Sequence, residues 1–105
     1  MMSSSARFFI GQIVCHKVFD YRGVIIDVDP IFSGSDEWYE AVAQSRPPKD
    51  MPWYHVLKDG TSEHTYVAEH NLEADDSGKP IHHPELKDYF AGLADDIYLP
   101  RHASN

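Results

Sequence analysis

Apolar and polar residues alternate over short stretches of the first part of the chain, and this period of two predicts β-strands. Residues 11–18 follow a glycine, mix β-branched with polar residues and lack a helix cap, which predicts a first strand. Residues 24–29 predict a second strand. Its one face would carry Val24, Ile26 and Val28, and its other face Ile25, Asp27 and Asp29.

Turn residues separate and then end these two strands. Asp20–Gly23 predicts a tight turn, because Asp can bond the backbone that follows it and Gly accepts a positive φ. Pro30 ends the second strand, since it has no amide hydrogen for the sheet. An insertion then spans residues 31–52. In it, residues 35–44 predict a short helix with a Ser or Asp cap, and the proline-rich residues 46–52 predict a surface loop.

A β-hairpin is the clearest local prediction from the sequence. Residues 53–58 and 61–68 flank the dipeptide Asp59-Gly60, which favours a two-residue type I′ turn. With that turn, His55 would lie opposite His64. The paired faces would be Trp53, His55, Leu57, His64 and Tyr66 on one side, and Tyr54, Val56, Thr65 and Val67 on the other. Both faces are partly apolar, so either could be the buried one.

The pattern changes after the hairpin. Residues 69–73 predict a turn and a short last strand, and residues 75–80 an exposed loop. Residues 84–96 can form a helix, because apolar residues recur at spacings of three or four, namely Leu86, Tyr89, Phe90, Leu93 and Ile97. We expect this stripe to pack on the flank of the strands; docking on another subunit or a partner is the alternative.

These elements predict a mainly β fold of about five antiparallel strands, arranged as a small closed barrel with a helical insertion. We expect an N-terminal tail over residues 1–8, one barrel domain over residues 9–74 that includes the insertion 31–52, and a C-terminal helical or extended segment over residues 75–105. The 105 residues are enough for one hydrophobic core and too few for two.

Composition narrows the class of protein. With 42% hydrophobic and 25% charged residues the chain should fold as an ordinary globular protein. No apolar run approaches the roughly 20 residues that cross a bilayer, and the N-terminus does not resemble a secretory signal, so we expect a cytoplasmic protein without a membrane partner. The lone Cys15 lies within a strand pattern, where cysteine usually acts as a small hydrophobe.

The net charge of −8 bears on possible partners. DNA-binding proteins gain affinity by replacing counterions with Lys and Arg, so the overall field of this chain repels DNA. Basic residues that could still form a local patch beside Tyr21 are Arg7, Lys17, Arg22, Arg46 and Lys49. A protein partner does not need a basic surface, so the acidic charge is compatible with a protein-binding role.

Few residues suggest catalytic chemistry. His55 and His64, with His16 on a neighbouring strand, could hold a metal if their nitrogens converged, but a hydrogen-bonded structural pair is the favoured reading. Asp27 and Asp29 could act as paired carboxylates or bind a cation, although solvated strand edges are the favoured explanation. No nucleophile triad, phosphate loop or nucleotide motif is present, so we expect no enzyme, metal or cofactor.

Several blocks of sequence, in this order and spacing, resemble one family. They are Ile10-Gly11-Gln12-Ile13-Val14 with His16, Tyr21-Arg22-Gly23-Val24, Asp27-Val28-Asp29-Pro30, Pro52-Trp53-Tyr54-His55-Val56, and His64-Thr65-Tyr66-Val67-Ala68-Glu69 with Leu72. Over residues 9–74 the chain is similar to the HspQ, or hemimethylated DNA-binding (YccV-like), family of bacterial heat-shock proteins. The fourth and fifth blocks together are the most specific part of the resemblance.

The resemblance implies an SH3-like barrel, no catalytic activity and a homo-oligomer, a trimer. It also implies two roles: a specificity factor and substrate of the Lon protease in protein quality control, and a hemimethylated DNA-binding protein linked to replication. Because Trp and Tyr carry much of the energy of protein interfaces, the candidate partner-binding residues are Tyr21, Arg22, Trp38, Trp53, His55, His64 and Tyr66.

Overall fold

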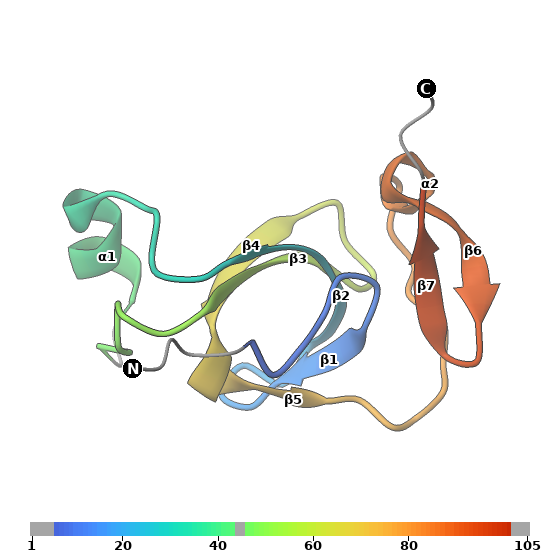
Figure 1. Ribbon diagram of the computed structural model, residues 1–105, viewed down its shortest axis with the longest axis horizontal. Coiled ribbons are helices and arrows are strands. Elements are labelled where there is room, and N and C mark those ends of the chain that lie inside the picture. The colour runs from blue at the N-terminus through green and yellow to red at the C-terminus, as the bar shows by residue number, and fades with distance from the viewer. Residues whose placement is uncertain (1–5, 44–45, 102–105) are drawn as a thin grey trace.

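The main structural element is a five-stranded antiparallel sheet, shown in Figure 1 for a computed structural model that describes residues 6–43 and 46–101. Its strands are β1 (Ile13–His16), β2 (Arg22–Asp29), β3 (Trp53–Lys58), β4 (His64–Ala68) and β5 (Leu72–Ala74), in the order β4-β3-β2-β1-β5. A separate two-stranded sheet contains β6 (Phe90–Ala94) and β7 (Ile97–Pro100). The prediction of a mainly β fold with five strands in its principal sheet is confirmed.

The sheet curls but does not close into the predicted barrel (Figure 1). The 3-10 helix η1 (Glu69–Asn71) follows β4 and turns the chain, so that β5 pairs with β1 and not with β4. Within the described residues no strand pairing joins β4 to β5. Strand β4 therefore keeps one edge free of a neighbouring strand.

The turn between β1 and β2 lies earlier than predicted. It ends at Asp20, which takes a left-handed φ of 56°, and Gly23 is already part of β2. A Cβ atom at Gly23 would lie 2.4 Å from Cγ1 of Val56 and 2.6 Å from the carbonyl oxygen of Leu57. The glycine is therefore explained by the close approach of β3, and not by a positive φ.

A β-bulge changes which residues of β2 share a face. Ile25 lies opposite Val56, but the register shifts after Ile25 so that Asp27 lies opposite His55. Ile25 and Val28 consequently pack on the same inner cluster, whereas Asp27 and Asp29 lie beside His55. The predicted grouping of Ile25 with the two aspartates is wrong, because an extra residue reverses the alternation beyond it.

The β3–β4 hairpin is confirmed, but its predicted register is wrong by two residues. His55 pairs with Tyr66 rather than with His64, and Trp53 pairs with Ala68. The connection spans residues 59–63, because Asp59 does not take the positive φ that a type I′ turn requires and its amide donates to the carbonyl of Arg22. A shift of two residues leaves each side chain on its predicted face.

Both faces of the hairpin are buried, which answers the question that the sequence left open. The inner face contributes to a cluster made of Phe8, Val14, Ile25, Tyr54, Val56, Val67 and Leu72. On the outer face, Trp53 is covered by the insertion and Leu57 by the C-terminal segment. The middle of this outer face, at His55 and Tyr66, is only partly buried.

The insertion contains the predicted helix, α1 (Asp36–Val42), and Gln44 lies outside the described residues. The Ser35 side chain caps the helix by accepting a hydrogen bond from the amide of Trp38 (3.0 Å). The proline loop is attached to the aromatic residues, since Trp53 Nε1 donates to the carbonyl of Pro48 at 3.0 Å. None of the described helices is long and apolar enough to cross a membrane.

The helix predicted over residues 84–96 is wrong. Only α2 (Leu86–Tyr89) is helical, and β6 and β7 form a hairpin around Asp95 and Asp96, whose φ angles are 52° and 66°. Two consecutive positive φ angles form a type I′ hairpin turn, which a helix cannot contain. Leu86, Tyr89 and Phe90 pack with Ile13, Val24 and Leu57, so this part of the predicted stripe covers the flank of the sheet as expected. The other two residues of the stripe, Leu93 and Ile97, are exposed.

Two residues of the predicted tail over residues 1–8, Arg7 and Phe8, belong to the fold. Residues 1–5 lie outside the described residues. Phe8 is only 5% exposed and its amide donates to the hydroxyl of Tyr54 at 3.2 Å, while the amide of Arg7 donates to Glu69 at 2.8 Å. The tail prediction is therefore wrong for Arg7 and Phe8, because a short stretch before the first strand gives no local signal of such long-range contacts.

Candidate binding groove

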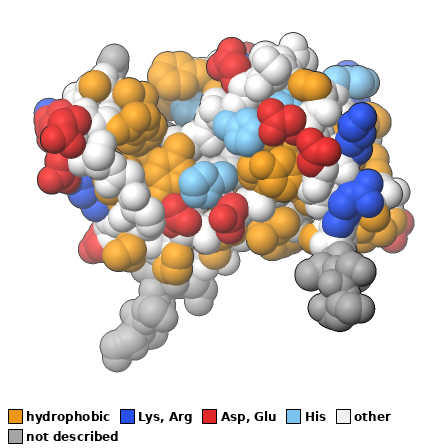
Figure 2. Space-filling model, turned by 90° about the horizontal axis from the view of Figure 1, so that it is seen from above, with side chains coloured by type: hydrophobic (Ala, Val, Ile, Leu, Met, Phe, Trp, Pro, Cys, Tyr) orange, Lys and Arg blue, Asp and Glu red, His pale blue; other side chains and the backbone are white. Residues whose placement is uncertain are grey.

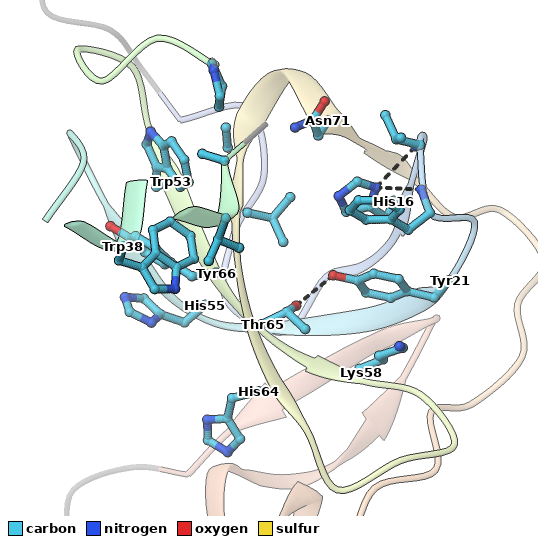
Figure 3. Close-up of a pocket in the computed structure, with 17 residues that line it drawn as sticks. His16, Tyr21, Trp38, Trp53, His55, Lys58, His64, Thr65, Tyr66 and Asn71 are labelled. Atoms are coloured by element: carbon cyan, nitrogen blue, oxygen red, sulfur yellow. Dashed lines mark hydrogen bonds between the residues drawn. The ribbon is translucent and has the colours of Figure 1, made fainter. Parts of the chain in front are cut away.

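A groove of about 620 Å³ follows the free edge of β4 (Figure 3). In this view the Trp38, His55 and Tyr66 side chains lie on one side of the strand, and Tyr21 and His16 on the other. We call it the β4 groove, and it is lined by His16, Val18, Phe19, Tyr21, Trp38, Val42, Ala43, Pro47, Trp53, His55, Lys58, His64, Thr65, Tyr66, Val67, Ala68 and Asn71. The sequence elements that line it are far apart in the chain.

The first wall of the groove is an aromatic cluster built by the insertion against β3 and β4. The Tyr66 ring lies 5.1 Å from that of Trp53 and 5.7 Å from that of Trp38, measured between centroids. Phe32 lies behind them, 4.9 Å from Trp53. Trp53 is only 2% exposed and anchors the cluster, whereas Trp38 and Tyr66 are partly buried and line the groove. Such aromatic contacts stabilise a rigid wall.

The second wall is the β1–β2 turn. The ring of His16 stacks on Phe19 at 4.7 Å and lies 5.2 Å from Tyr21. His16 Nδ1 accepts hydrogen bonds from the amides of Val18 and Phe19, both at 3.1 Å. Burial lowers the pKa of His16, which favours the neutral ring that this acceptor role requires. Phe19 itself is 73% exposed.

The turn wall is linked directly to β4. The hydroxyl of Tyr21 donates to Oγ1 of Thr65 at 2.8 Å, and the ammonium of Lys58 lies 4.8 Å from the Tyr21 ring. Burial raises the pKa of Tyr21, so its hydroxyl stays protonated and can donate. The lining contains Lys58 and three histidines but no Asp or Glu. The groove is therefore apolar with some positive character, on a chain whose net charge is −8.

A hydrogen-bonded network lies at the rim of the aromatic wall. Tyr66 donates to Oδ2 of Asp29 at 2.6 Å, and His55 Nε2 lies 3.0 Å from the same oxygen. Burial disfavours ionisation of Asp29, but the hydrogen bonds from Tyr66 and His55 outweigh it and lower its pKa. Burial, together with the bond to Asp29, raises the pKa of Tyr66 to about 12. The network therefore contains a carboxylate and a neutral phenol at neutral pH.

The histidines that we considered as metal ligands do not converge. His64 Nε2 instead lies 2.9 Å from Glu85, and His16 lies across the groove from His55. In the described part of the chain, the one grouping with ligand atoms within 4.8 Å of one another is Asp27, Asp29 and His55. Because Asp29 already accepts two hydrogen bonds there, we interpret this grouping as the structural network described above.

The structure brings six of the seven candidate partner-binding residues to the β4 groove, namely Tyr21, Trp38, Trp53, His55, His64 and Tyr66. Arg22 lies elsewhere, between Asp59 and Asp75, with nitrogen–oxygen distances of 3.2 Å to each. Sequence reasoning missed Phe19 and Val42, which are 73% and 53% exposed on the two walls. The available signal was an aromatic residue in a turn, where polar residues are usual.

Cys15 does not have the properties of a reactive thiol. It is partly buried, and burial together with a hydrogen bond to Asp75 raises its pKa to about 11. A nucleophilic cysteine needs the opposite shift, because the thiolate is the reactive form. This agrees with our interpretation of Cys15 as a small hydrophobic residue.

The basic residues do not form a continuous strip. On the face shown in Figure 2, hydrophobic, His and acidic side chains are interspersed, and Lys and Arg lie towards its ends. Three residues of the basic patch that we considered are paired with carboxylates: Arg22 with Asp59, Arg46 with Glu40 at 2.6 Å, and Lys49 with Asp36 at 3.1 Å. Such pairing reduces the positive field available to a phosphate backbone.

Comparison with known protein families gives one match that covers most of the chain. The family model YccV-like, described as "Hemimethylated DNA-binding protein YccV like", matches residues 6–96. The match includes the sheet, the insertion and the β4 groove, and it continues through α2 and β6 of the C-terminal segment.

Proposed function

The chain belongs to the YccV-like, hemimethylated DNA-binding family, and from this premise we propose that it is an HspQ-like heat-shock protein that binds other proteins. In this proposal it acts without catalysis in the cytoplasm, as a specificity factor and a substrate of the Lon protease. Its role is to hold part of a client protein while the protease engages that client.

The observation that carries this proposal is the chemistry of the β4 groove. Its lining is largely aromatic and aliphatic, with exposed Phe19 and Val42, and it contains no carboxylate. Exposed aromatic side chains in a concave surface are typical of protein and peptide interfaces. A nucleic acid would instead require Lys and Arg along the surface, and Lys58 is the one Lys or Arg in this lining.

A degradation assay with purified Lon tests the proposal. We expect addition of the chain to change the rate at which Lon degrades an unfolded client several-fold, and the chain itself to be degraded. The variant Phe19→Ser should lose most of the effect on the client, since Phe19 is exposed in the groove, while Leu99→Ser, at an exposed position of β7, should behave as wild type. An unchanged client rate together with a stable chain would refute this role.

Binding of hemimethylated DNA is a second candidate, favoured by the description of the family. Among the described residues, the Lys and Arg side chains without a carboxylate within ion-pairing distance are the bases we expect to contact phosphates, namely Arg7, Lys17, Lys58, Lys79, Lys87 and Arg101. A titration with unmodified, hemimethylated and fully methylated duplexes at two salt concentrations tests it. Equal affinity for the three duplexes would eliminate methylation readout, and no salt dependence would eliminate phosphate contacts.

The family resemblance also supports assembly into a homo-oligomer, and we propose a trimer. Exposed apolar side chains outside the groove could form its interface, among them Phe9, Ile31, Leu93 and Ile97. Light scattering that gives the mass of a single chain at micromolar concentration would refute this part of the proposal.

A further inference from the structure

The free edge of β4 presents unpaired backbone groups to the groove. The amide of Lys58 donates to the carbonyl of Glu63, and the amide of Glu69 donates to the carbonyl of Pro52. In an antiparallel pair the bonded residues alternate along each strand, so Thr65 and Val67 also direct their backbone groups towards β3. His64, Tyr66 and Ala68 must therefore direct their N–H and C=O groups outward.

At His64 and Tyr66 these outward groups have no partner among the described residues. No hydrogen bond within residues 6–43 and 46–101 uses the backbone N–H or C=O of His64 or Tyr66 outside the β3–β4 ladder. Ala68 differs, because it is only 3% exposed and its C=O accepts the first i→i+3 bond of η1. An unpaired strand edge is a ready template for another extended chain. His64 and Tyr66 are in phase and would give an added strand a short run of main-chain hydrogen bonds.

The two walls of the groove suit the alternating side chains of an added strand. Side chains of successive residues in a strand point to opposite faces. Those on one face would contact Trp38 and Tyr66, which lie on one side of β4 in Figure 3. Those on the other face would contact the β1–β2 turn, which contributes Phe19 to the groove. Val18, at 63% exposed, and Val42, at 53%, extend these walls towards solvent. The groove thus provides apolar contacts on both sides of the unpaired edge.

The charge of the lining indicates what kind of segment it accepts. Lys58 and the three histidines His16, His55 and His64 face the groove, and no Asp or Glu lines it. A second copy of this chain would bring its own Lys58 and the same edge, so symmetric pairing gains no charge complementarity. A polyanion such as DNA would not use the strand edge. An extended apolar segment with acidic residues complements both the edge and the charge.

We propose that the β4 groove binds an extended, apolar and acidic segment of a client protein by β-strand addition to the outward edge at His64 and Tyr66. This inference rests on the proposed function as a protein-binding factor and specifies how that binding occurs. Main-chain hydrogen bonds would give affinity with little dependence on sequence, and the aromatic walls would select apolar residues. Clients would then need to be locally unfolded to bind.

Binding can be measured with the full chain and reduced, carboxymethylated α-lactalbumin, which is an unfolded acidic polypeptide. We expect Phe19→Ser to weaken binding about tenfold and Val42→Ser less, because both remove exposed apolar contacts. Lys58→Glu should also weaken binding of this acidic probe. The matched control is Leu99→Ser, which removes an exposed apolar side chain outside the groove and should change the affinity less than twofold.

Amide hydrogen exchange measured by NMR tests the strand addition itself. Saturating probe should slow exchange at the amides of His64 and Tyr66 by at least tenfold. Thr65 and Val67, whose amides face β3, should already exchange slowly and serve as internal controls. Docking on the side chains alone would not produce this alternating pattern.

The remaining outcomes separate this inference from the proposed function. No binding of the probe, or binding without protection of the two outward amides, would overturn the inference. Protection without probe, in a species of twice the chain mass, would assign the edge to a second copy and also overturn it. Because the measurement needs no protease, protection by the probe combined with no effect on Lon would refute the proposed function while supporting strand addition.

Discussion

Two tyrosine–carboxylate pairs on opposite faces of the β3–β4 hairpin have almost the same geometry. On the inner face, Tyr54 donates to Glu69 at 2.6 Å, and on the outer face, Tyr66 donates to Asp29 at 2.6 Å. In each pair burial, followed by the bond to the carboxylate, raises the pKa of the tyrosine to about 12. Each tyrosine therefore remains a hydrogen-bond donor at neutral pH.

The pairs differ in burial and in what they attach. Tyr54 is 0% exposed and accepts the amide of Phe8, so the inner pair attaches the N-terminal segment to the core. Tyr66 is partly buried, accepts the amide of Ser33 at 3.0 Å and lines the β4 groove, so the outer pair attaches the insertion. The same chemistry thus stabilises the core on one face and positions a binding wall on the other.

Replacement of the buried tyrosine should have the largest effect. Tyr54→Phe leaves Glu69 with only the amide of Arg7 as a partner and leaves the buried amide of Phe8 without its acceptor. Loss of hydrogen bonds to a buried charged group should lower the free energy of unfolding by about 2–3 kcal/mol. Urea unfolding of the two proteins measures this. A loss as small as the one expected for Tyr66→Phe in the outer pair would show that burial does not make the two pairs differ in their contribution to stability.

The contrast between these two faces was only partly accessible to sequence reasoning. Alternation along the hairpin placed Tyr54 and Tyr66 on opposite faces, and the structure confirms this, although the register is shifted. Their carboxylate partners could not be predicted. Asp29 reaches Tyr66 only because of a bulge in β2, and Glu69 reaches Tyr54 only because η1 turns the chain after β4. Both depend on long-range packing rather than on local pattern.

The β4 groove and the C-terminal segment show the same limit. Aromatic content identified Tyr21, Trp38 and Tyr66 as candidates, but only the fold brings them to one strand edge. Apolar residues from position 86 onward fit a helical period, but the segment forms a hairpin because Asp95 and Asp96 take left-handed φ angles. As a sequence signal for such a turn, Asp-Asp is weaker than Asn-Gly. The local sequence pattern therefore predicted the strands of the main sheet well. It failed for the C-terminal segment and for the groove, where contacts between distant parts of the chain decide the conformation.

Replacement of the outer tyrosine should have a smaller effect on stability and a clear effect on binding. Tyr66→Phe removes the bonds to Asp29 and Ser33, but both groups are near solvent and can bond to water, so we expect a loss of about 1 kcal/mol. Affinity for the unfolded probe should also fall, because the insertion wall is less firmly positioned. Tyr54→Phe is the matched control. Without urea, and at a temperature well below its unfolding transition, this variant should bind the probe as wild type does.

The smallest expected effect is a pH dependence that comes from neither pair, since both tyrosines lose their protons only near pH 12. Burial lowers the pKa of His16 below its ordinary value of 6.5. Above pH 6.5 the ring is neutral in both states and its contribution is complete; as the pH falls, the unfolded chain takes up the proton first, so stability falls. Protonation at Nδ1 would also remove the acceptor for the amides of Val18 and Phe19.

The variant His16→Asn tests this origin of the pH dependence, because it keeps a side-chain acceptor that does not titrate. Urea unfolding between pH 7.5 and 5.5 should therefore show a loss of unfolding free energy in wild type, Tyr54→Phe and Tyr66→Phe, and a smaller loss in His16→Asn. Equal slopes of this free energy against pH in all four proteins would show that His16 is not the titrating group.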